Sequence, residues 1–600
     1  MHSGCKAAVV LLALCACCIP AASASSWDRD IDSPMFRDPV LPRARVEYTF
    51  PKNIAAVWRE ALERPGADLP CQAALAIAEA HRQGMLGLEP LIEPLRRALD
   101  DASRHPSVRL AAAGALIELN ARTMASNLFR LAETGDQDLR NLIEPALARW
   151  DYQPARAVWL KRLNQRDTPP HALVLAVRGL GLVRQAQAAQ PLRKLVFDAQ
   201  QSAAIRLEAA WALGRIQTAG AESDAQRLLA GGTGNIVRRL AAVALLRHHQ
   251  GTAGELLLQG LLKDPEPAVV RPALKRLAEL DPRVILPNLE PLLANRDAEV
   301  RLAAVKVLFQ EMTPARLPLL VDRCHDPHPR VRVRARRFLR TLADRPAYRP
   351  AIITQVSQLL AGNDWRAQEQ AAILLPELGH VPAAPRLVEL LDSNRPEVCV
   401  AAAWGVRQLD DPAMLPAVLR YVQRPHQDII TFGTRLAPRN AMAGAFDDQM
   451  AQLIQFLGKN RYRPAEAILR QFVPKAPPQS RAPVGGHARA AAIWALGLLH
   501  ENHSDPEVSA LVEQPLWAVL TGPNPDDERV FRMCLITLAR MRSPAALKLA
   551  NIFYRIKKPT TNSINNAAGW AVEHITGKPV PHEATEVRTV GRWFLAPLGS

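Results

Sequence analysis

The 600-residue sequence has few aromatic residues and no stretch after its first twenty residues that is long and apolar enough to span a membrane. Aromatic side chains make up 5% of the chain, yet 48% of the residues are hydrophobic, with many Ala, Leu and Val. This content excludes wholesale disorder and a collagen-like chain. Because a domain usually contains about 100–200 residues, the chain comprises either several domains or an array of repeats.

Proline and positive charge are in excess. Proline accounts for 49 of the 600 residues, or about 8%, against a usual value near 5%. Lys and Arg number 75 against 58 Asp and Glu, which gives a formal net charge of +17. The charge favours an acidic or polyanionic partner.

The N-terminal segment has the pattern of a secretory signal. Lys6 precedes an apolar run from Ala7 to Ile19, and Ala22-Ser23-Ala24 places small residues before a cleavage site. The run is shorter than the ~20 apolar residues that span a bilayer. The pattern predicts a signal peptide over residues 1–24, cleaved after Ala24, and a protein exported to the periplasm or cell envelope.

Two alternatives to simple cleavage remain at this end. Leu14-Cys15-Ala16-Cys17 resembles a bacterial lipobox, which would leave Cys17 lipidated and the protein anchored to a membrane by lipid. The apolar run could instead be a buried N-terminal helix. The cysteines outside this segment are Cys71, Cys324, Cys399 and Cys534, with no Cys-x-x-Cys pair, so neither a disulfide framework nor a zinc spacing is present.

A frame of the form Val-Arg-x-x-Ala-x-x-Ala-Leu recurs along the chain. Its Arg position falls at 72, 109, 140, 173, 206, 239, 271, 301, 332, 368 and 399, and again at 489 and loosely near 531. A period of about 33 residues holds two helices and two turns, and Asp-Pro pairs such as Asp264-Pro265 and Asp326-Pro327 suit helix starts at the junctions. The fold class predicted is all-α, an α-solenoid of helix pairs.

These residues resemble HEAT repeats, particularly the short subclass named after phycobilisome lyases. The resemblance covers residues 53–415 well and 487–550 fairly. The family includes scaffolds, adaptors, chromophore lyases and DNA glycosylases, so the resemblance implies the fold and leaves the function open. Ile575-Thr576-Gly577-Lys578, followed by Arg592-Trp593-Phe594, resembles a tail of exported bacterial HEAT proteins and suits a cap on the last repeat.

Breaks in the pattern divide the chain further. We expect a signal peptide at 1–24, an extended arm at 25–52 that lies on the first repeats or is free, the HEAT array at 53–415, degenerate helical repeats at 416–472, a Pro/Gly-rich loop at 473–486, HEAT-like repeats at 487–558 and a C-terminal cap or tail at 559–600. Asp28-x-Asp30-x-Asp32 in the arm lacks the Gly and Glu of a calcium loop.

Motifs that carry chemistry are few. There is no phosphate-binding glycine loop, no His-Glu-x-x-His and no Gly-x-Ser-x-Gly. Cys324-His325-Asp326-Pro327-His328 fits a capping turn better than a metal site, and His248-His249 fits a helix end. We therefore predict no catalytic residues, no metal and no cofactor.

The fifth position after the frame Arg lies opposite the apolar face of its helix. In HEAT repeats the second helix lines the concave surface, so the resemblance implies that this column faces a groove. Large aromatic and cationic side chains are typical interface anchors. The candidate binding residues are Trp211, Arg276, Lys306, Arg337, Trp404 and Trp494. The alternative is that each Trp folds over a small neighbour such as Gly214 or Gly405 and only completes packing between repeats.

Arginines gather in the middle of the array, at Arg330, Arg332, Arg334, Arg336, Arg337, Arg340, Arg345 and Arg349. They surround the polar arc of one helix, so they form either a solvated face or an anion-binding patch.

The function predicted is an exported, non-enzymatic HEAT-repeat scaffold that binds a protein or another macromolecule along its groove. Two other classes stay open. One is a nucleic-acid-binding protein with a basic groove, which export disfavours. The other is an enzyme or enzyme subunit resembling HEAT-like chromophore lyases.

Overall fold

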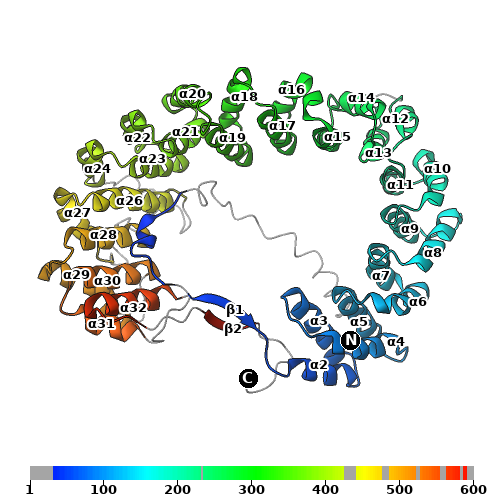
Figure 1. The fold of residues 1–600 in the computed structure, drawn as a ribbon, viewed down its shortest axis with the longest axis horizontal. Helices are drawn as coiled ribbons and strands as arrows, with labels where there is room; N and C mark the ends of the chain where they lie inside the picture. Colours follow the sequence, from blue (N-terminus) through cyan, green and yellow to red (C-terminus); the bar gives the residue numbers. More distant parts are fainter. Residues whose placement is uncertain are drawn as a thin grey trace, which may run out of the picture. The chain divides into compact units, whose positions relative to one another are not determined.

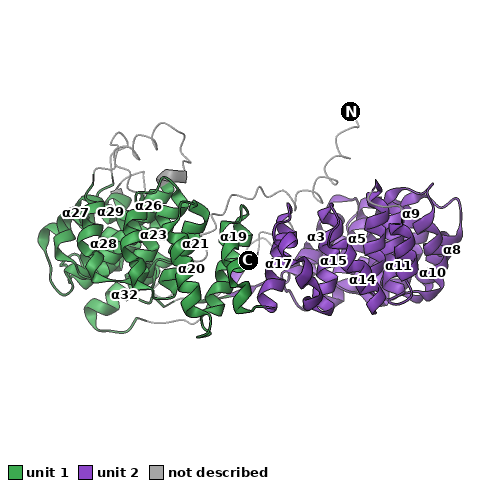
Figure 2. Ribbon diagram, turned by 90° about the horizontal axis from the view of Figure 1, so that it is seen from above, with its two compact units in different colours: residues 1–46, 312–586 green, residues 47–311, 587–600 purple. Residues whose placement is uncertain are grey.

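A computed structural model describes residues 31–42, 44–230, 234–424, 441–475, 485–521, 527–554, 562–580 and 585–590. The predicted signal peptide, with Cys17 and Ala24, lies outside these residues, as do Arg592-Trp593-Phe594. The chain divides into two compact units (Figure 2), unit 1 formed by residues 1–46 and 312–586 and unit 2 by residues 47–311 and 587–600. No helix among the described residues has the length and hydropathy needed to cross a membrane.

Unit 2 is a row of antiparallel helix pairs, as the repeat predicted (Figure 1). Its helices are α2 (Ile54–Glu63), α3 (Asp68–Arg82), α4 (Ile92–Asp100), α5 (Pro106–Glu118), α6 (Ala125–Thr134), α7 (Gln137–Arg149), α8 (Gln153–Asn164), α9 (Pro170–Leu182), α10 (Ala189–Phe197), α11 (Ala203–Ile216), α12 (Glu222–Leu229), α13 (Ile236–Leu246), α14 (Thr252–Leu261), α15 (Pro267–Leu280), α16 (Leu289–Leu293) and α17 (Ala298–Gln310).

Unit 1 continues the same architecture. Its helices are the 3-10 helix η1 (Pro34–Arg37), α18 (Leu317–Asp322), α19 (Pro329–Leu342), α20 (Arg349–Ala361), α21 (Trp365–Glu377), α22 (Ala384–Leu390), α23 (Pro396–Leu409), α24 (Leu415–Val422), α26 (Ala441–Lys459), α27 (Glu466–Phe472), α28 (Gly486–Leu499), α29 (Pro506–Thr521), α30 (Glu528–Arg540), α31 (Ala546–Phe553) and α32 (Ser563–Thr576). The strands β1 (Arg45–Thr49) and β2 (Thr585–Thr589) pair with each other.

The predicted α-solenoid is confirmed, and the frame positions lie where the helix-pair interpretation requires. Every frame position falls in the second helix of a pair, from α3 to α23 and again in α28 and α30. Consecutive second helices pack on one another in each unit. We call them the inner helices and their shared surface the inner face, because they line the concave side of each unit (Figure 1).

The frame arginine has a repeated structural role. Arg109 donates to Leu99 O at 3.2 Å, Arg206 to Val196 O at 3.2 Å and Arg489 to Val473 O at 2.9 Å. Each acceptor lies at the C-terminal end of the preceding outer helix, where a cation complements the helix dipole. Part of the chain's positive charge therefore stabilises the repeats and is not available to a partner.

The junction residues also act as predicted. Asp264 accepts a hydrogen bond from Glu266 N at 2.8 Å, and Asp326 accepts one from His328 N at 2.8 Å. Pro267 and Pro329 open α15 and α19, where proline costs no backbone hydrogen bond. Much of the proline excess thus serves to start helices.

Glycines let inner helices approach closely. A Cβ on Gly181 would lie 2.7 Å from Ala212 Cβ, and one on Gly214 would lie 2.6 Å from the carbonyl oxygens of Ala244 and Leu245. The backbone of α13, rather than the Trp211 ring, therefore faces Gly214. A Cβ on Gly405 would likewise lie 2.8 Å from Ala372 O.

The last described helix closes the final repeat. Ala571 of α32 packs with Ala539 and Ala550, and Trp570 and Ile575 pack beside them. Gly577 ends α32 with φ +68°, a left-handed conformation that favours glycine. This is the place that a C-terminal cap would take.

Candidate functional site

The N-terminal arm lies across the inner face of unit 1. Residues 31–42 run past α23, α26, α28 and α30 (Figure 1), so the expectation that the arm lies on the first repeats is wrong for this segment. Ile31 packs against Cys399, Val400 and Ala445 at one end of this path. Pro42 lines a small cavity with Tyr554 and Trp570 at the other end. No local pattern links the arm to helices some 400 residues away, so its docking position could not be predicted.

Trp404 and Trp494 bind this arm. Trp404 Nε1 donates to Asp32 Oδ1 at 3.2 Å, and Trp494 Nε1 donates to Asp38 Oδ2 at 2.9 Å. Each indole is only 4% exposed. The expectation that the two side chains are available to an outside partner therefore fails, because a segment of the same chain covers them.

An arginine completes each of these carboxylate sites. Arg407 Nη2 donates to Asp32 Oδ1 at 2.6 Å and to Asp32 O at 3.2 Å. Arg540 pairs with Asp38 Oδ1, the other oxygen of the carboxylate that Trp494 binds. Arg407 lies in the last turn of α23 and Arg540 ends α30. An indole N–H and an arginine near the C-terminal end of an inner helix thus hold one aspartate.

Electrostatics favour the bound arm at neutral pH. Burial alone would raise the pKa of Asp32, but the charge of Arg407 and the hydrogen bonds from Trp404 and Arg407 outweigh it, so the pKa lies below its ordinary value. Burial lowers the pKa of Arg407, and the Asp32 carboxylate opposes that shift.

A glutamine row on α26 recognises the arm. Gln452 Nε2 donates to Asp32 O at 3.0 Å, while Gln455 accepts from Met35 N at 3.2 Å and donates to Ser33 Oγ at 2.8 Å. Gln449, one turn earlier, donates to Leu391 O at 2.8 Å. Three glutamines at a spacing of three, on the helical face of α26 that is buried, are the feature of the sequence that could have indicated this site.

The middle of the arm is buried against the same helices. Met35 has no exposed surface, and Phe36 stacks on His487 with ring centroids 5.7 Å apart. Arg532 donates to Phe36 O at 2.5 Å. Both the side chains and the backbone of the arm therefore bind to the inner helices, so the segment is part of unit 1.

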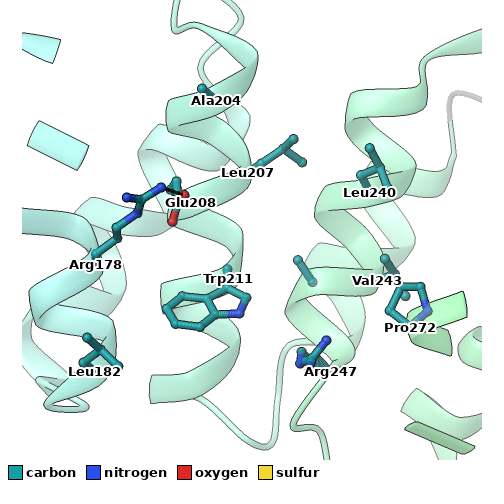
Figure 3. Close-up of a pocket in the computed structure, with 11 residues that line it drawn as sticks. Arg178, Leu182, Ala204, Leu207, Glu208, Trp211, Leu240, Val243, Arg247 and Pro272 are labelled. Atoms are coloured by element: carbon teal, nitrogen blue, oxygen red, sulfur yellow. Dashed lines mark hydrogen bonds and ion pairs between the residues drawn. The ribbon is translucent and has the colours of Figure 1, made fainter. Parts of the chain in front are cut away.

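Trp211 lies in a different environment in unit 2. It lines a cavity of about 630 Å³ formed along the inner helices α9, α11, α13 and α15 (Figure 3). The lining is mostly apolar and consists of Arg178, Leu182, Ala204, Leu207, Glu208, Trp211, Leu240, Val243, Ala244, Arg247 and Pro272. We call this set the Trp211 cavity.

The cavity arises from small residues at groove-facing positions. Ala244 is the equivalent on α13 of Trp211 on α11, each five residues after its frame position. Pro272 follows the frame position on α15. Because these side chains on α13 and α15 are short, they do not fill the space beside the Trp211 indole. The apolar side chains of Leu207 and Leu240 therefore border an open cavity (Figure 3).

Positive charge collects beside the Trp211 cavity. Arg215 lies over the Trp211 ring at 4.5 Å, and among the described residues Arg184, Arg215 and Arg247 have no carboxylate within ion-pair distance. The buried Nε of Arg215 has no hydrogen-bond partner there either. Burial lowers the pKa of Arg215, and the charges of Arg184 and Arg247 lower it further.

The positive charges of these arginines also affect the pKa of His248. Burial lowers its pKa below the ordinary 6.5, and the charges of Arg215, Arg247, Arg276 and Arg184 add to the shift. His249, in contrast, is 1% exposed and its Nε2 lies 2.7 Å from Glu222 Oε1. Arg178 at the rim of the cavity pairs with Glu208. Arg215 and Arg247 are therefore the arginines near the cavity that could bind an anion.

The three remaining candidates are not gathered at this cavity. Arg276 donates to His249 O at 2.7 Å, which gives it a role within the array. Lys306 on α17 is exposed, and Arg337 on α19 is exposed in unit 1. Of the six predicted residues, Trp211 alone lines the Trp211 cavity.

The central arginines are largely engaged with unit 1. Arg332 is 4% exposed and donates to Asp326 O at 3.1 Å and to Glu369 at 3.2 Å. Arg336 is 2% exposed and donates to Gln370 at 3.0 Å and Glu377 at 3.2 Å. Arg332 and Arg336 therefore connect α19 to α21. Because they are buried and already paired, these two arginines do not form part of an open anion-binding patch.

The Cys324–His328 segment is a capping turn. Cys324 is buried, and burial raises the pKa of its thiol to about 12. The His328 ring accepts from Arg330 N at 3.3 Å at the start of α19, while His325 Nδ1 lies 2.7 Å from Asp364 Oδ2. These residues serve the helix junction.

One cluster in the described part of the chain has metal-ligating groups within reach of one another, namely Glu466, His500 and Asp505. Arg470 already occupies it, at 2.7 Å from Glu466 and 3.4 Å from Asp505. A guanidinium between two carboxylates takes the place that a cation would need, so the cluster is an ion-pair network.

Residues 157–246 and 254–340 match the family model for HEAT repeats. The matched residues are similar to HEAT repeats and include every residue that lines the Trp211 cavity except Arg247. No curated protein matches the sequence.

Several solved structures share the repeated helical architecture. Yeast importin-β (Kap95p) aligns with a TM-score of 0.47 at 13% identity, over 87% of this chain and 72% of its own. A structure of Kap95p bound to RanGDP gives 0.48 at 14% identity, over 87% and 72%. Kap121p bound to Pho4p gives 0.46 at 12% identity, over 87% of this chain and 56% of its own. Likeness at this level carries no information about a shared partner.

Proposed function

We propose that the protein is an exported, non-enzymatic HEAT-repeat scaffold that binds a protein partner on the inner face of unit 2, along α9 to α15. The observation that carries the proposal is the Trp211 cavity, which combines an open apolar lining with arginines that have no acidic partner among the described residues. Exposed apolar surface beside Trp and Arg is the composition of protein-binding hot spots.

The repeat architecture supports a role in binding. A solenoid presents an extended surface built from equivalent positions of successive helices, and partners bind along several repeats at once. The Trp211 cavity spans four consecutive inner helices in this manner. On the inner face of unit 1, the tryptophans at the equivalent positions, Trp404 and Trp494, are already bound by residues 31–42.

Photo-crosslinking in the native host tests the proposal. A photoreactive amino acid placed at Leu240 on the inner face should capture a defined protein, because Leu240 lines the Trp211 cavity. The matched control is Leu256 on α14, an outer helix, where the leucine is 66% exposed. Equal capture at both positions, or none at Leu240, would contradict binding on the inner face of unit 2.

Export is tested separately at the N-terminus. We expect the protein isolated from the cell envelope to begin after Ala24, or at a lipidated Cys17, because the first residues carry the signal pattern. Mass spectrometry of the N-terminal peptide distinguishes the two. A full-length N-terminus on protein that stays in the cytoplasm would refute export and leave the binding surface to be tested on its own.

A further inference from the structure

The structure contains its own example of what an inner face binds. In unit 1 the carboxylate of Asp38 lies between Trp494 Nε1, at 2.9 Å, and Arg540. These two side chains belong to consecutive inner helices, α28 and α30. An apolar side chain nearby in the same segment, Met35, is fully buried.

Unit 2 places the same two residue types beside one cavity, without an occupant from the described chain. Trp211 on α11 and Arg247, which caps α13, also belong to consecutive inner helices, and both line the Trp211 cavity (Figure 3). Arg247 follows its frame position by eight residues, as Arg407 does on α23. The cavity of about 630 Å³ beside them has room for an apolar side chain such as the one that Met35 buries in unit 1.

We propose that the Trp211 cavity binds a short acidic segment of a partner protein, with a carboxylate held by Trp211 and Arg247 and a neighbouring apolar side chain inside the cavity. The inference rests on the proposed function and specifies the chemistry of the partner. The three arginines without acidic partners in the described residues, Arg184, Arg215 and Arg247, supply the complementary charge.

The arm indicates the spacing of such a segment. Asp32 and Asp38 lie three residues before and three residues after Met35. The Asp32 carboxylate binds α23 and the Asp38 carboxylate binds α28 and α30, with α26 between them. We therefore expect an acidic residue, an apolar residue about three positions on, and a second acidic residue about three positions further.

Affinity in unit 2 should be lower than that of the docked arm. In unit 1, Gln452 and Gln455 of α26 bind the backbone of the segment, and the residues that line the Trp211 cavity include no glutamine. The arm also benefits from covalent attachment, which gives it a high effective concentration. A free peptide is therefore not expected to displace the arm from unit 1.

Fluorescence anisotropy with the full chain tests the inference. The probe is a labelled synthetic peptide with the sequence of residues 31–42, Ile-Asp-Ser-Pro-Met-Phe-Arg-Asp-Pro-Val-Leu-Pro, at about 0.15 M salt. We expect binding that weakens at least tenfold when the peptide carries D32N and D38N, because a charge-assisted bond is lost at each site.

Variants of the chain locate the site. Arg247→Gln and Trp211→Ser should each weaken binding of the peptide at least tenfold, because each removes one of the two groups assigned to the carboxylate. Lys306→Gln removes the same charge from an exposed inner-helix position outside the cavity and should change the affinity less than twofold. Thermal unfolding checks that each variant remains folded.

Four results would overturn the inference. The first is equal binding by Arg247→Gln and the unmodified chain. The second is loss of binding in Trp494→Phe but not in Trp211→Ser, which would mean that the peptide had exchanged with the arm. The third is competition by a single-stranded oligonucleotide as effective as unlabelled peptide, which would assign the cavity to nucleic acid. The fourth is no binding of the peptide.

The proposed function is judged by other data. If crosslinking from Leu240 captures a partner while the peptide fails to bind, the scaffold function stands and the acidic-segment inference is refuted. If the peptide binds but Leu240 captures nothing in the host, the site recognises acidic segments and the proposed function fails.

Discussion

The inner faces of units 1 and 2 carry the same residue types and use them differently. In unit 1, Trp404 and Trp494 are 4% exposed and donate to aspartates of the chain's own arm. In unit 2, Trp211 is partly exposed beside an open cavity. A tryptophan at a groove-facing position is therefore evidence of a binding surface, and only the structure shows whether the bound segment belongs to the same chain.

The difference has an energetic side. Side chains that hold the arm contribute to the stability of unit 1, since their partners are always present. Those that line the Trp211 cavity, apart from Val243, are at least partly exposed and are available for binding. Three pairs of substitutions and one pH experiment should separate the two roles, and they are ordered from the largest expected effect to the smallest.

Met35→Ala should have the largest effect. Met35 is fully buried, and truncation of a buried methionine costs about 3 kcal/mol. That corresponds to about a hundredfold larger undocked fraction of the arm.

Limited trypsinolysis after Arg37 measures this fraction, because Arg37 is exposed but its backbone is held in η1. Leu207→Ala, in the Trp211 cavity, should cost less than about 1 kcal/mol of unfolding free energy. A cleavage rate unchanged by Met35→Ala would show that the arm is not docked in solution.

Arg407→Gln should come next, at about 2 kcal/mol. It leaves the Asp32 carboxylate, which is 42% exposed, without its cation, and that exposure keeps the loss below the value for a fully buried pair. The control is Arg247→Gln in unit 2, which should change the unfolding free energy by less than about 0.5 kcal/mol. Chemical denaturation compares the two, and equal losses would remove the distinction between the units.

Trp494→Phe tests the indole N–H alone. The ring is retained while the hydrogen bond to Asp38 is lost, so we expect unit 1 to lose about 1.5 kcal/mol. Trp211→Phe should leave the unfolding free energy within about 0.5 kcal/mol, because no described residue accepts a hydrogen bond from Trp211. A larger loss for Trp211→Phe than for Trp494→Phe would reverse the assignment of roles.

Acid should loosen the arm modestly. The pKa of Asp32 is lowered in the folded chain from an ordinary value of 3.8, so its stabilising contribution is complete above about pH 4 and is lost as the pH falls through the lowered value. Hydrogen exchange of the Met35 amide, corrected for the intrinsic rate at each pH, reports this release. In Asp32→Asn the exchange rate of the Met35 amide should depend less on pH. An unchanged pH dependence in this variant would mean that other carboxylates cause the release of the arm.

Much of the fold could be predicted because its determinants are local. The frame recurs at a fixed spacing, so the inner helices, the role of the frame arginine and the Asp-Pro starts all follow from short stretches of sequence. The place of Trp211 on the inner face follows from the same helical periodicity.

The rest depends on contacts without a local pattern. Asp32 meets Arg407 and Asp38 meets Arg540 across more than 370 residues, and neither arm residue marks its destination in the sequence. The cavity exists because Ala244 and Pro272 are short where their neighbours are long, and such a void is visible only after the helices are packed. α26 departs from the repeat frame, and two of its glutamines, Gln452 and Gln455, bind the arm.

The docked arm also changes how the molecule should unfold. In an array of repeats each pair touches only its neighbours, so end repeats can fray one at a time. Residues 31–42 connect α23, α26, α28 and α30 through contacts that span 372 to 502 positions. Those four repeats must therefore order or disorder as one cooperative block, and closing so long a loop of chain makes its assembly a late step in folding. The helices along the Trp211 cavity have no such clamp in the described chain, so they keep the repeat-by-repeat flexibility that lets a solenoid adjust to what it binds.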